Sequence, residues 1–188
     1  MTKKYNIEEI IAGCRQGNPL YQRALVNDYS ELLFAVAYRY VGNETLAKDV
    51  LQEAYIRIFK SFGTFDENKG ALTTWMRKVT VNAALRQLQK KFLKTSSLTL
   101  ELNEKFHTSP EAIQKMTHDE IMEVVSSLPE GYRQVFNLNV IEGYSHREIS
   151  TMLNIQEVTS RSKLSRAKQM LRNKLSTFKN SDIWIKTI

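Results

Sequence analysis

Two carboxylates and an amide stand close together in the segment "NETLAKDVLQEAYIRIFK". Asp49, Gln52 and Glu53 are three and four residues apart, so they share one face if the segment is helical. Such a carboxylate pair can be catalytic or bind a metal ion, and helical di-metal sites add a histidine at Glu-x-x-His spacing. No histidine precedes residue 107. On residue type alone, a solvated surface and a polar docking face both remain open.

The rest of the chain shows no catalytic constellation. His107, His118 and His146 are scattered and match no metal-ligand spacing, which favours surface or capping roles. The sequence contains no Gly-rich phosphate loop, GxSxG elbow or HExxH motif. The single cysteine, Cys14, excludes an internal disulfide framework, and we expect it to be a small buried hydrophobe. We therefore predict a protein that is not an enzyme, with no metal, no cofactor and no small-molecule substrate.

Positive charge is gathered in two segments of the chain. The 188 residues carry 27 Lys and Arg against 20 Asp and Glu, a net charge of +7. Residues 68–100 and residues 158–181 each hold seven basic side chains and no acidic one, so the remainder is acidic overall. Because local cation density and counterion release drive phosphate binding, this distribution favours two contacts with a polyanion. The alternative is a pair of solvated helix faces.

Helical periodicity runs through nearly the whole sequence, and no stretch alternates long enough to predict a strand. The periodic segments that we interpret as helices are residues 6–16, 20–41, 44–62, 71–92, 111–127, 130–141, 145–153 and 157–177. Between them, "LKTSSLTLELNEKFHTSP" lacks a period and ends at a proline, as is typical of a linker. We predict an all-α protein with two small helical domains joined by a flexible linker. The boundaries are domain 1–93, linker 94–111, domain 112–180 and tail 181–188.

The C-terminal domain contains the pattern of a helix-turn-helix, "YSHREISTMLNIQEVTSRSKLSRAKQML". Ser145 stands three residues before Glu148, the spacing of a capping box that begins a helix. Asn154 follows that helix, and asparagine tolerates the left-handed backbone that a tight interhelical turn requires. The small side chain of Ser150 suits a close helix crossing. We expect the helix that follows, residues 157–177, to be the recognition helix.

The predicted recognition helix combines one apolar stripe with basic side chains. Leu164, Ala167, Leu171, Leu175 and Phe178 share one side and should face the core of the domain. Thr159, Ser162 and Arg166 lie on the opposite face, near the end that usually enters the major groove. The cations flank the stripe, placed to meet the phosphates of the two DNA strands, with Arg161, Lys168 and Arg172 on one edge and Lys163 and Lys174 on the other.

The basic segment of the N-terminal domain suits single-stranded nucleic acid. The loop from Phe65 to Gly70 combines an aromatic ring, amides and a cation, which could hold a base taken out of the stack. We take Phe65, Asn68 and Lys69 as its candidate contacts. Trp75 is more often core than a stacking platform at such spacing. In the helix that follows, the candidates for phosphate and base contacts are Arg77, Lys78, Asn82, Arg86, Lys90 and Lys91.

These motifs resemble the extracytoplasmic-function (ECF) branch of the bacterial sigma-70 factors. In the C-terminal domain the pattern is that of the family's fourth region, which ends roughly in GTV.SR..RA and binds the minus-thirty-five promoter element. The matching residues are Leu128-Pro129, Arg133, Val135-Phe136, Leu138, Gly143-Tyr144-Ser145, Glu148-Ile149, Thr159, Ser162 and Arg166-Ala167. The departures are Ser150 for alanine, Asn154 for glycine, Gln156 for serine and Val158 for glycine. The resemblance implies that Thr159, Arg161, Ser162, Lys163, Arg166 and Lys168 contact that element.

The N-terminal domain is similar to the family's second region. Asp49, Gln52 and Glu53 match its D-x-x-Q-E segment, which docks on the clamp helices of the largest RNA polymerase subunit, so the resemblance implies that these three residues bind core polymerase. Trp75 and Asn82 match its minus-ten melting module, to which the resemblance assigns the loop and helix residues named above. Arg86 stands where aspartate is common, and Gln89 where arginine is common.

The resemblance implies a sigma factor that binds core RNA polymerase and promoter DNA and directs transcription initiation. A protein antagonist, an anti-sigma factor, is common in this family, although no residue proves one here. Two other interpretations stay open: a helix-turn-helix regulator that acts without polymerase, and a helical adaptor whose cations meet acidic proteins. The chain has no run of eighteen apolar residues and no signal-peptide pattern, so we expect a cytoplasmic protein without membrane insertion.

Overall fold

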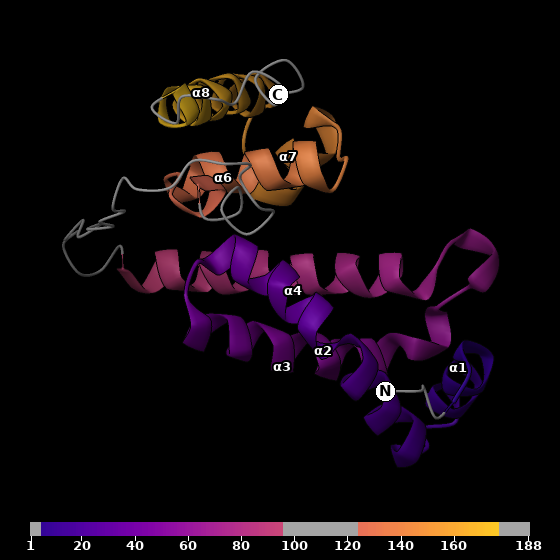
Figure 1. The fold of residues 1–188 in the computed structure, drawn as a ribbon. Helices are drawn as coiled ribbons and strands as arrows, with labels where there is room; N and C mark the ends of the chain where they lie inside the picture. Colours follow the sequence, from indigo (N-terminus) through magenta and orange to yellow (C-terminus); the bar gives the residue numbers. More distant parts are fainter. Residues whose placement is uncertain (1–4, 96–123, 177–188) are drawn as a thin grey trace. The chain divides into compact units, whose positions relative to one another are not determined.

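The computed structural model describes residues 5–95 and 124–176, and these residues form helices and connecting turns without a strand. Two compact units divide the chain, residues 1–99 and residues 100–188. The predicted fold class, all-α with two helical units and a C-terminal helix-turn-helix, is confirmed (Figure 1). The predicted tail and most of the predicted linker and of the helix at 111–127 lie outside the described residues. Within the described ranges, no helix is both long and apolar enough to span a bilayer.

The N-terminal unit contains four α-helices, and asparagine caps begin the first three of them. These helices are α1 (Ile7–Arg15), α2 (Pro19–Val41), α3 (Glu44–Ser61) and α4 (Leu72–Thr95), with the 3-10 turns η1 (Phe62–Thr64) and η2 (Glu67–Lys69) between α3 and α4. The side chains of Asn6, Asn18 and Asn43 each accept a hydrogen bond from a backbone N–H of the first turn. Free N–H groups at a helix start are thereby satisfied. All four helices lie within one or two residues of the predicted boundaries, except that α4 continues to Thr95.

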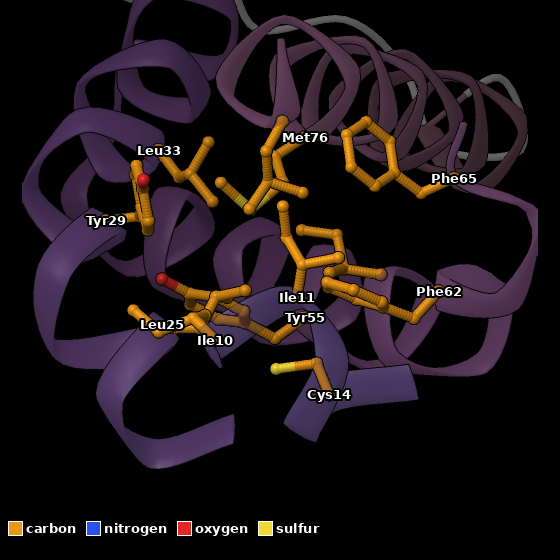
Figure 2. Close-up of a cluster of buried hydrophobic side chains, with 12 residues drawn as sticks. Ile10, Ile11, Cys14, Leu25, Tyr29, Leu33, Tyr55, Phe62, Phe65 and Met76 are labelled. Atoms are coloured by element: carbon orange, nitrogen blue, oxygen red, sulfur yellow. The ribbon is translucent and has the colours of Figure 1, made fainter. Parts of the chain in front are cut away.

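A core of aliphatic and aromatic side chains joins these helices (Figure 2). α2, α3 and α4 pack against one another, and α1 packs against α2 (Figure 1). In α3, the apolar residues Val50, Ala54 and Ile58 recur at helical spacing and are buried, whereas Leu46 is half-buried. Cys14 is buried as predicted, and burial raises the pKa of its thiol to about 11. The thiol is therefore protonated and unreactive at neutral pH.

Gly13 of α1 lies directly against the side chain of Tyr21 of α2. A Cβ added to Gly13 would lie 2.1 Å from Cδ2 and 2.7 Å from Cβ of Tyr21, so the ring of Tyr21 occupies the space that a side chain would need. The same ring packs against Tyr5 with 4.9 Å between ring centroids. The absence of a side chain at this helical position therefore allows α1 to dock.

Replacing Gly13 with alanine is expected to destabilise the protein by about 1–3 kcal/mol because it overpacks the contact with Tyr21. The expected change in stability is opposite to the usual one, because replacing glycine by alanine within a helix normally stabilises it by about 1 kcal/mol. Urea denaturation followed by circular dichroism measures the change. Gly63→Ala is the matched control, because nothing lies within 4 Å of a Cβ at Gly63. An equal loss in both variants would contradict the close-approach argument.

The C-terminal unit packs its last described helix against a small core. Its helices are α6 (Glu130–Phe136), which continues into the π-helical turn η3 (Asn137–Ile141), α7 (His146–Leu153) and α8 (Glu157–Ser176), and residues 124–126 are also helical. α8 packs against both α6 and α7. The core beneath α8 consists of Val125, Leu128, Phe136, Ala167 and Leu171, with Leu164 against it. The apolar stripe predicted for α8 is thus confirmed at the positions whose side chains the structure describes.

Candidate nucleic-acid interface

α7 and α8 form a helix-turn-helix whose turn is fixed by local hydrogen bonds. Both halves of the predicted capping box are present: the Glu148 N–H donates to Ser145 Oγ at 3.3 Å, and the Ser145 N–H donates to Glu148 Oε2 at 2.8 Å. Asn154 ends α7 at φ 51° and ψ 51°, and its N–H donates to the Ser150 carbonyl. This left-handed conformation is the one predicted for Asn154. The turn therefore sets the direction in which α8 leaves α7.

One edge of α8 is occupied by contacts within the unit. Lys174 Nζ donates to Ser127 Oγ at 2.5 Å, next to the N-terminus of α6. Lys163 is half-buried, and its Nζ lies 3.1 Å from the position that a Cβ on Gly131 would take. Both cations thus lie toward α6 and the residues before it. Of the two flanking rows predicted from the sequence, this row supports the packing of α8.

The other edge and the outer face of α8 are open to solvent. Ser162, Arg166 and Arg172 are exposed, and Thr159 and Lys168 are half-buried. Arg161 is exposed and forms an ion pair with Glu157 one turn earlier. Ser162 Oγ donates to the Thr159 carbonyl at 3.0 Å, which uses its proton and leaves the oxygen able to accept. This surface offers guanidinium donors and hydroxyls close to the helix N-terminus.

A polar pair that the sequence analysis did not single out links α7 to α8. Ser160 is fully buried, and its Oγ lies 2.9 Å from Nδ1 of His146, the first residue of α7. In the family pattern GTV.SR..RA this position is valine, so the serine was a visible signal that a buried polar contact replaces an apolar one. The hydrogen bond satisfies a hydroxyl that burial would otherwise penalise.

Replacing Ser160 with valine is expected to cost about 1 kcal/mol of stability, because it removes the partner of the His146 ring. His146→Leu leaves the buried hydroxyl unpaired and is expected to cost a similar amount. The double variant should lose less than the sum, because the two residues act as a pair. Chemical denaturation of the three variants and the wild type gives the coupling free energy between Ser160 and His146. Strictly additive losses would show that the contact contributes no stability.

α4 presents a basic and amide face along its solvent side. Lys78, Asn82, Arg86 and Lys90 are exposed and follow one another at intervals of four residues. Lys91 is also exposed, and Arg77 is half-buried. On the other side of the helix Met76, Ala84 and Leu88 are buried. Packing against α2 and α3 therefore fixes which side of α4 faces outward.

The loop before α4 is held by ion pairs, and its aromatic residue is covered. Phe65 is 5% exposed, and its ring packs on Trp75 with 5.3 Å between ring centroids. Arg15 Nη2 donates to the Phe65 carbonyl at 3.0 Å, and its other terminal nitrogen pairs with Glu67 at 3.0 Å. Phe65 therefore belongs to the core of this unit, whereas the loop after it remains at the surface.

Asp66 organises the exposed part of this loop. Its carboxylate accepts hydrogen bonds from the N–H and the amide of Asn68 at 3.0 and 3.2 Å, and it pairs with Lys69 at 3.3 Å. The backbone donor of Asn68 and then Lys69 lower the pKa of this carboxyl. Asn68 and Lys69 are both exposed, so the turn holds one amide and one cation at the surface.

The acidic face of α3 lies on the surface as the spacing predicted. Asp49 and Gln52 are exposed, and Glu53 is half-buried and pairs with Arg57 at 2.5 Å. Ile56, one turn after Gln52, is exposed as well. The face therefore combines the exposed carboxylate of Asp49 and amide of Gln52 with a glutamate in an ion pair and an exposed isoleucine. Among residues 5–95 and 124–176, no three His, Cys, Asp or Glu side chains gather as a metal site.

Two family models match the two units of the chain. Residues 25–92 match sigma-70 region 2, and residues 118–171 match sigma-70 region 4. The N-terminal match contains α3, the loop and most of α4, and the C-terminal match contains α7 and most of α8. The chain therefore belongs to the sigma-70 family of RNA polymerase sigma factors, as the resemblance in its sequence predicted.

The relatives narrow this assignment to the ECF branch. The chain is 27% identical over 157 residues to the ECF RNA polymerase sigma factor SigE of Mycolicibacterium smegmatis, covering 81% of this chain and 60% of that relative. It is 26% identical over 163 residues to the ECF sigma factor SigW of Bacillus subtilis, covering 80% and 87%. The fold is similar to that of the sigma factor RpoE of Bartonella quintana, solved with the anti-sigma factor NepR. In that comparison the TM-score is 0.54 at 17% identity, covering 82% of this chain and 96% of the other.

Proposed function

We propose that this chain binds core RNA polymerase and directs it to promoters by reading two separate DNA elements. The observation that carries the proposal is the pairing of two outward basic faces, on α4 and on α8, with membership of the ECF branch. Two linked contacts strengthen each other through effective concentration when their spacing matches the target. The protein acts by binding and positioning, without chemistry of its own, alongside polymerase in the cytoplasm.

The C-terminal unit reads duplex DNA at the minus-thirty-five element in this proposal. Thr159, Ser162 and Arg166 enter the major groove with the first turns of α8, and Arg166 can donate to guanine in bidentate fashion. Arg161 and Lys168 contact phosphates on the exposed edge. Lys163 contributes mainly by holding α8 against α6, since its Nζ lies beside Gly131.

The N-terminal unit captures the melted minus-ten strand with α4 and the loop before it. Lys78, Arg86, Lys90 and Lys91 attract the phosphates, together with Arg77, and Asn82 contacts a base or the backbone. Asn68 and Lys69 approach the same strand from the loop. We assign Phe65 a supporting role, because its ring is buried against Trp75 and shapes the loop from beneath.

The α3 face binds the polymerase. Asp49 and Gln52 offer an exposed carboxylate and amide for a charge-paired contact, and such contacts favour binding that can later be released. Glu53 also contacts the polymerase in this proposal, while its carboxylate stays in an ion pair with Arg57. An anti-sigma antagonist would act by covering this face or one of the DNA-binding faces, and this chain does not identify one.

Transcription with purified core polymerase on genomic fragments, with and without the chain, tests the proposal. We expect promoter-dependent transcripts only when the chain is present, and their loss in Asp49→Lys. Glu8→Lys is the matched control, because Glu8 is exposed on α1 and lies outside the region 2 match. Tight promoter binding by the chain alone, without polymerase-dependent transcripts, would instead support a helix-turn-helix regulator. An affinity for DNA that hardly depends on salt concentration would support the interpretation as a helical adaptor that binds acidic proteins.

A further inference from the structure

Val158, the second residue of α8, is an exposed apolar side chain at the tip of the recognition helix. It is 74% exposed, more than any other large hydrophobic residue in the described part of the chain. Thr159 and Ser162 beside it are polar, and Arg161 follows within one turn. An apolar group therefore stands alone among hydrogen-bonding and charged side chains.

Within residues 124–176 of the C-terminal unit, no contact that the structure describes accounts for valine at this position. A β-branched side chain is a weaker helix former than alanine or glutamate, and an exposed valine gains no burial. The family pattern has glycine here, so the fold does not require a side chain. A residue that departs from local preference without a compensating contact points to a functional contact outside the chain.

The chemistry of the major groove supplies one matching partner. Residues at the N-terminus of a recognition helix reach base edges, and the base edges there carry donors, acceptors and a single apolar group, the C5-methyl of thymine. We propose that Val158 packs against the C5-methyl group of a thymine in the upstream promoter element and thereby selects thymine at that position. The inference rests on the proposed function and adds a specificity-determining residue to it.

The contact also disfavours cytosine at the same position. Cytosine presents no methyl group at C5, so the apolar contact of Val158 is lost there. A 5-methylcytosine restores the apolar contact while keeping the amino group. Thymine and 5-methylcytosine should therefore both bind more tightly than cytosine at this position.

The test uses the holoenzyme formed by the full chain and core polymerase. The probe is a duplex selected by that holoenzyme from a library with a randomised upstream segment, and each thymine of the selected segment is then replaced in turn by deoxyuridine. This removes one methyl group and nothing else. We expect the affinity of the wild type to fall about fourfold at one thymine, from the value of one buried methylene. The holoenzyme with Val158→Ala should bind the duplex with thymine and the duplex with deoxyuridine at that position equally well.

Val140→Ala is the matched control, because Val140 is a half-exposed valine in η3 of the same unit. Its response to every deoxyuridine should equal that of the wild type. A wild type insensitive to every methyl removal, or a Val158→Ala variant with the same loss as the wild type, overturns this inference and leaves the proposed function intact. A wild-type holoenzyme that selects no upstream sequence at all would overturn both.

Discussion

Replacing Arg166 with methionine is expected to weaken promoter binding by the holoenzyme by about 1–3 kcal/mol, the range of a lost base or phosphate contact. Arg166 is exposed on the outer face of α8, two turns from the helix start, and its guanidinium can donate to guanine or to phosphate oxygens. Methionine keeps the length and helix preference of the side chain but removes the charge. Titration of labelled promoter duplex with the holoenzyme, at several salt concentrations, measures the loss.

The salt series distinguishes the two modes of contact. If Arg166 binds phosphate, the slope of log affinity against log salt should fall by about one and all sequences should weaken alike. If it reads a base, the loss should be confined to promoters that carry that base. Either outcome places Arg166 on DNA, whereas an unchanged affinity would remove it from the interface.

Lys174→Met is the matched control for this prediction. It removes the same charge from the same helix, but Lys174 donates to Ser127 on the edge next to α6. We expect a much smaller effect on DNA affinity than for Arg166→Met. If charge alone governed binding, the two variants would weaken it equally.

Replacing Arg133 with methionine is expected to destabilise the C-terminal unit by about 2–4 kcal/mol, because two carbonyls lose their donor. Arg133 is 8% exposed, and its Nη1 donates to the carbonyl oxygens of Ser126 at 2.6 Å and Leu128 at 3.3 Å. It therefore ties α6 to the end of the preceding helical segment. Hydrogen exchange of peptides from α8 in the full chain reports the stability of this unit separately.

Arg172→Met provides the comparison for Arg133→Met, since Arg172 is an exposed arginine on α8. Its exchange rates should match the wild type, because exposed substitutions change stability by at most about 0.5 kcal/mol. Equal protection in both variants would mean that the Arg133 contacts contribute little.

The parts of the fold that sequence predicts well are those with local causes. The capping box of Ser145 and Glu148 and the left-handed turn at Asn154 involve residues at most four positions apart. The period of apolar residues determines the buried side of α3 and α8 in the same way. Helix boundaries and the helix-turn-helix follow from these signals without knowledge of the tertiary contacts.

The features that sequence did not predict depend on residues far apart in the chain. Lys174 meets Ser127 across 47 positions, and Arg15 meets the Phe65 carbonyl across 50. The first contact turns one basic side chain of α8 toward the residues before α6, and the second holds the backbone at Phe65. The helix predicted at residues 130–141 is helical throughout, but its last turn, Asn137–Ile141, is π-helical. Asn137 is buried there, and an apolar-polar pattern alone does not reveal the wider turn.

The deep placement of Cys14 makes the wild-type chain a convenient background for spectroscopy. Its sulfur is shielded by the core and keeps its proton at neutral pH, so maleimide dyes will react with it slowly. A thiol introduced at an exposed site, as in Gln89→Cys or Ser165→Cys, will then take up the dye almost alone. Fluorescence from one labelled helix can follow promoter opening in real time without first removing the natural cysteine.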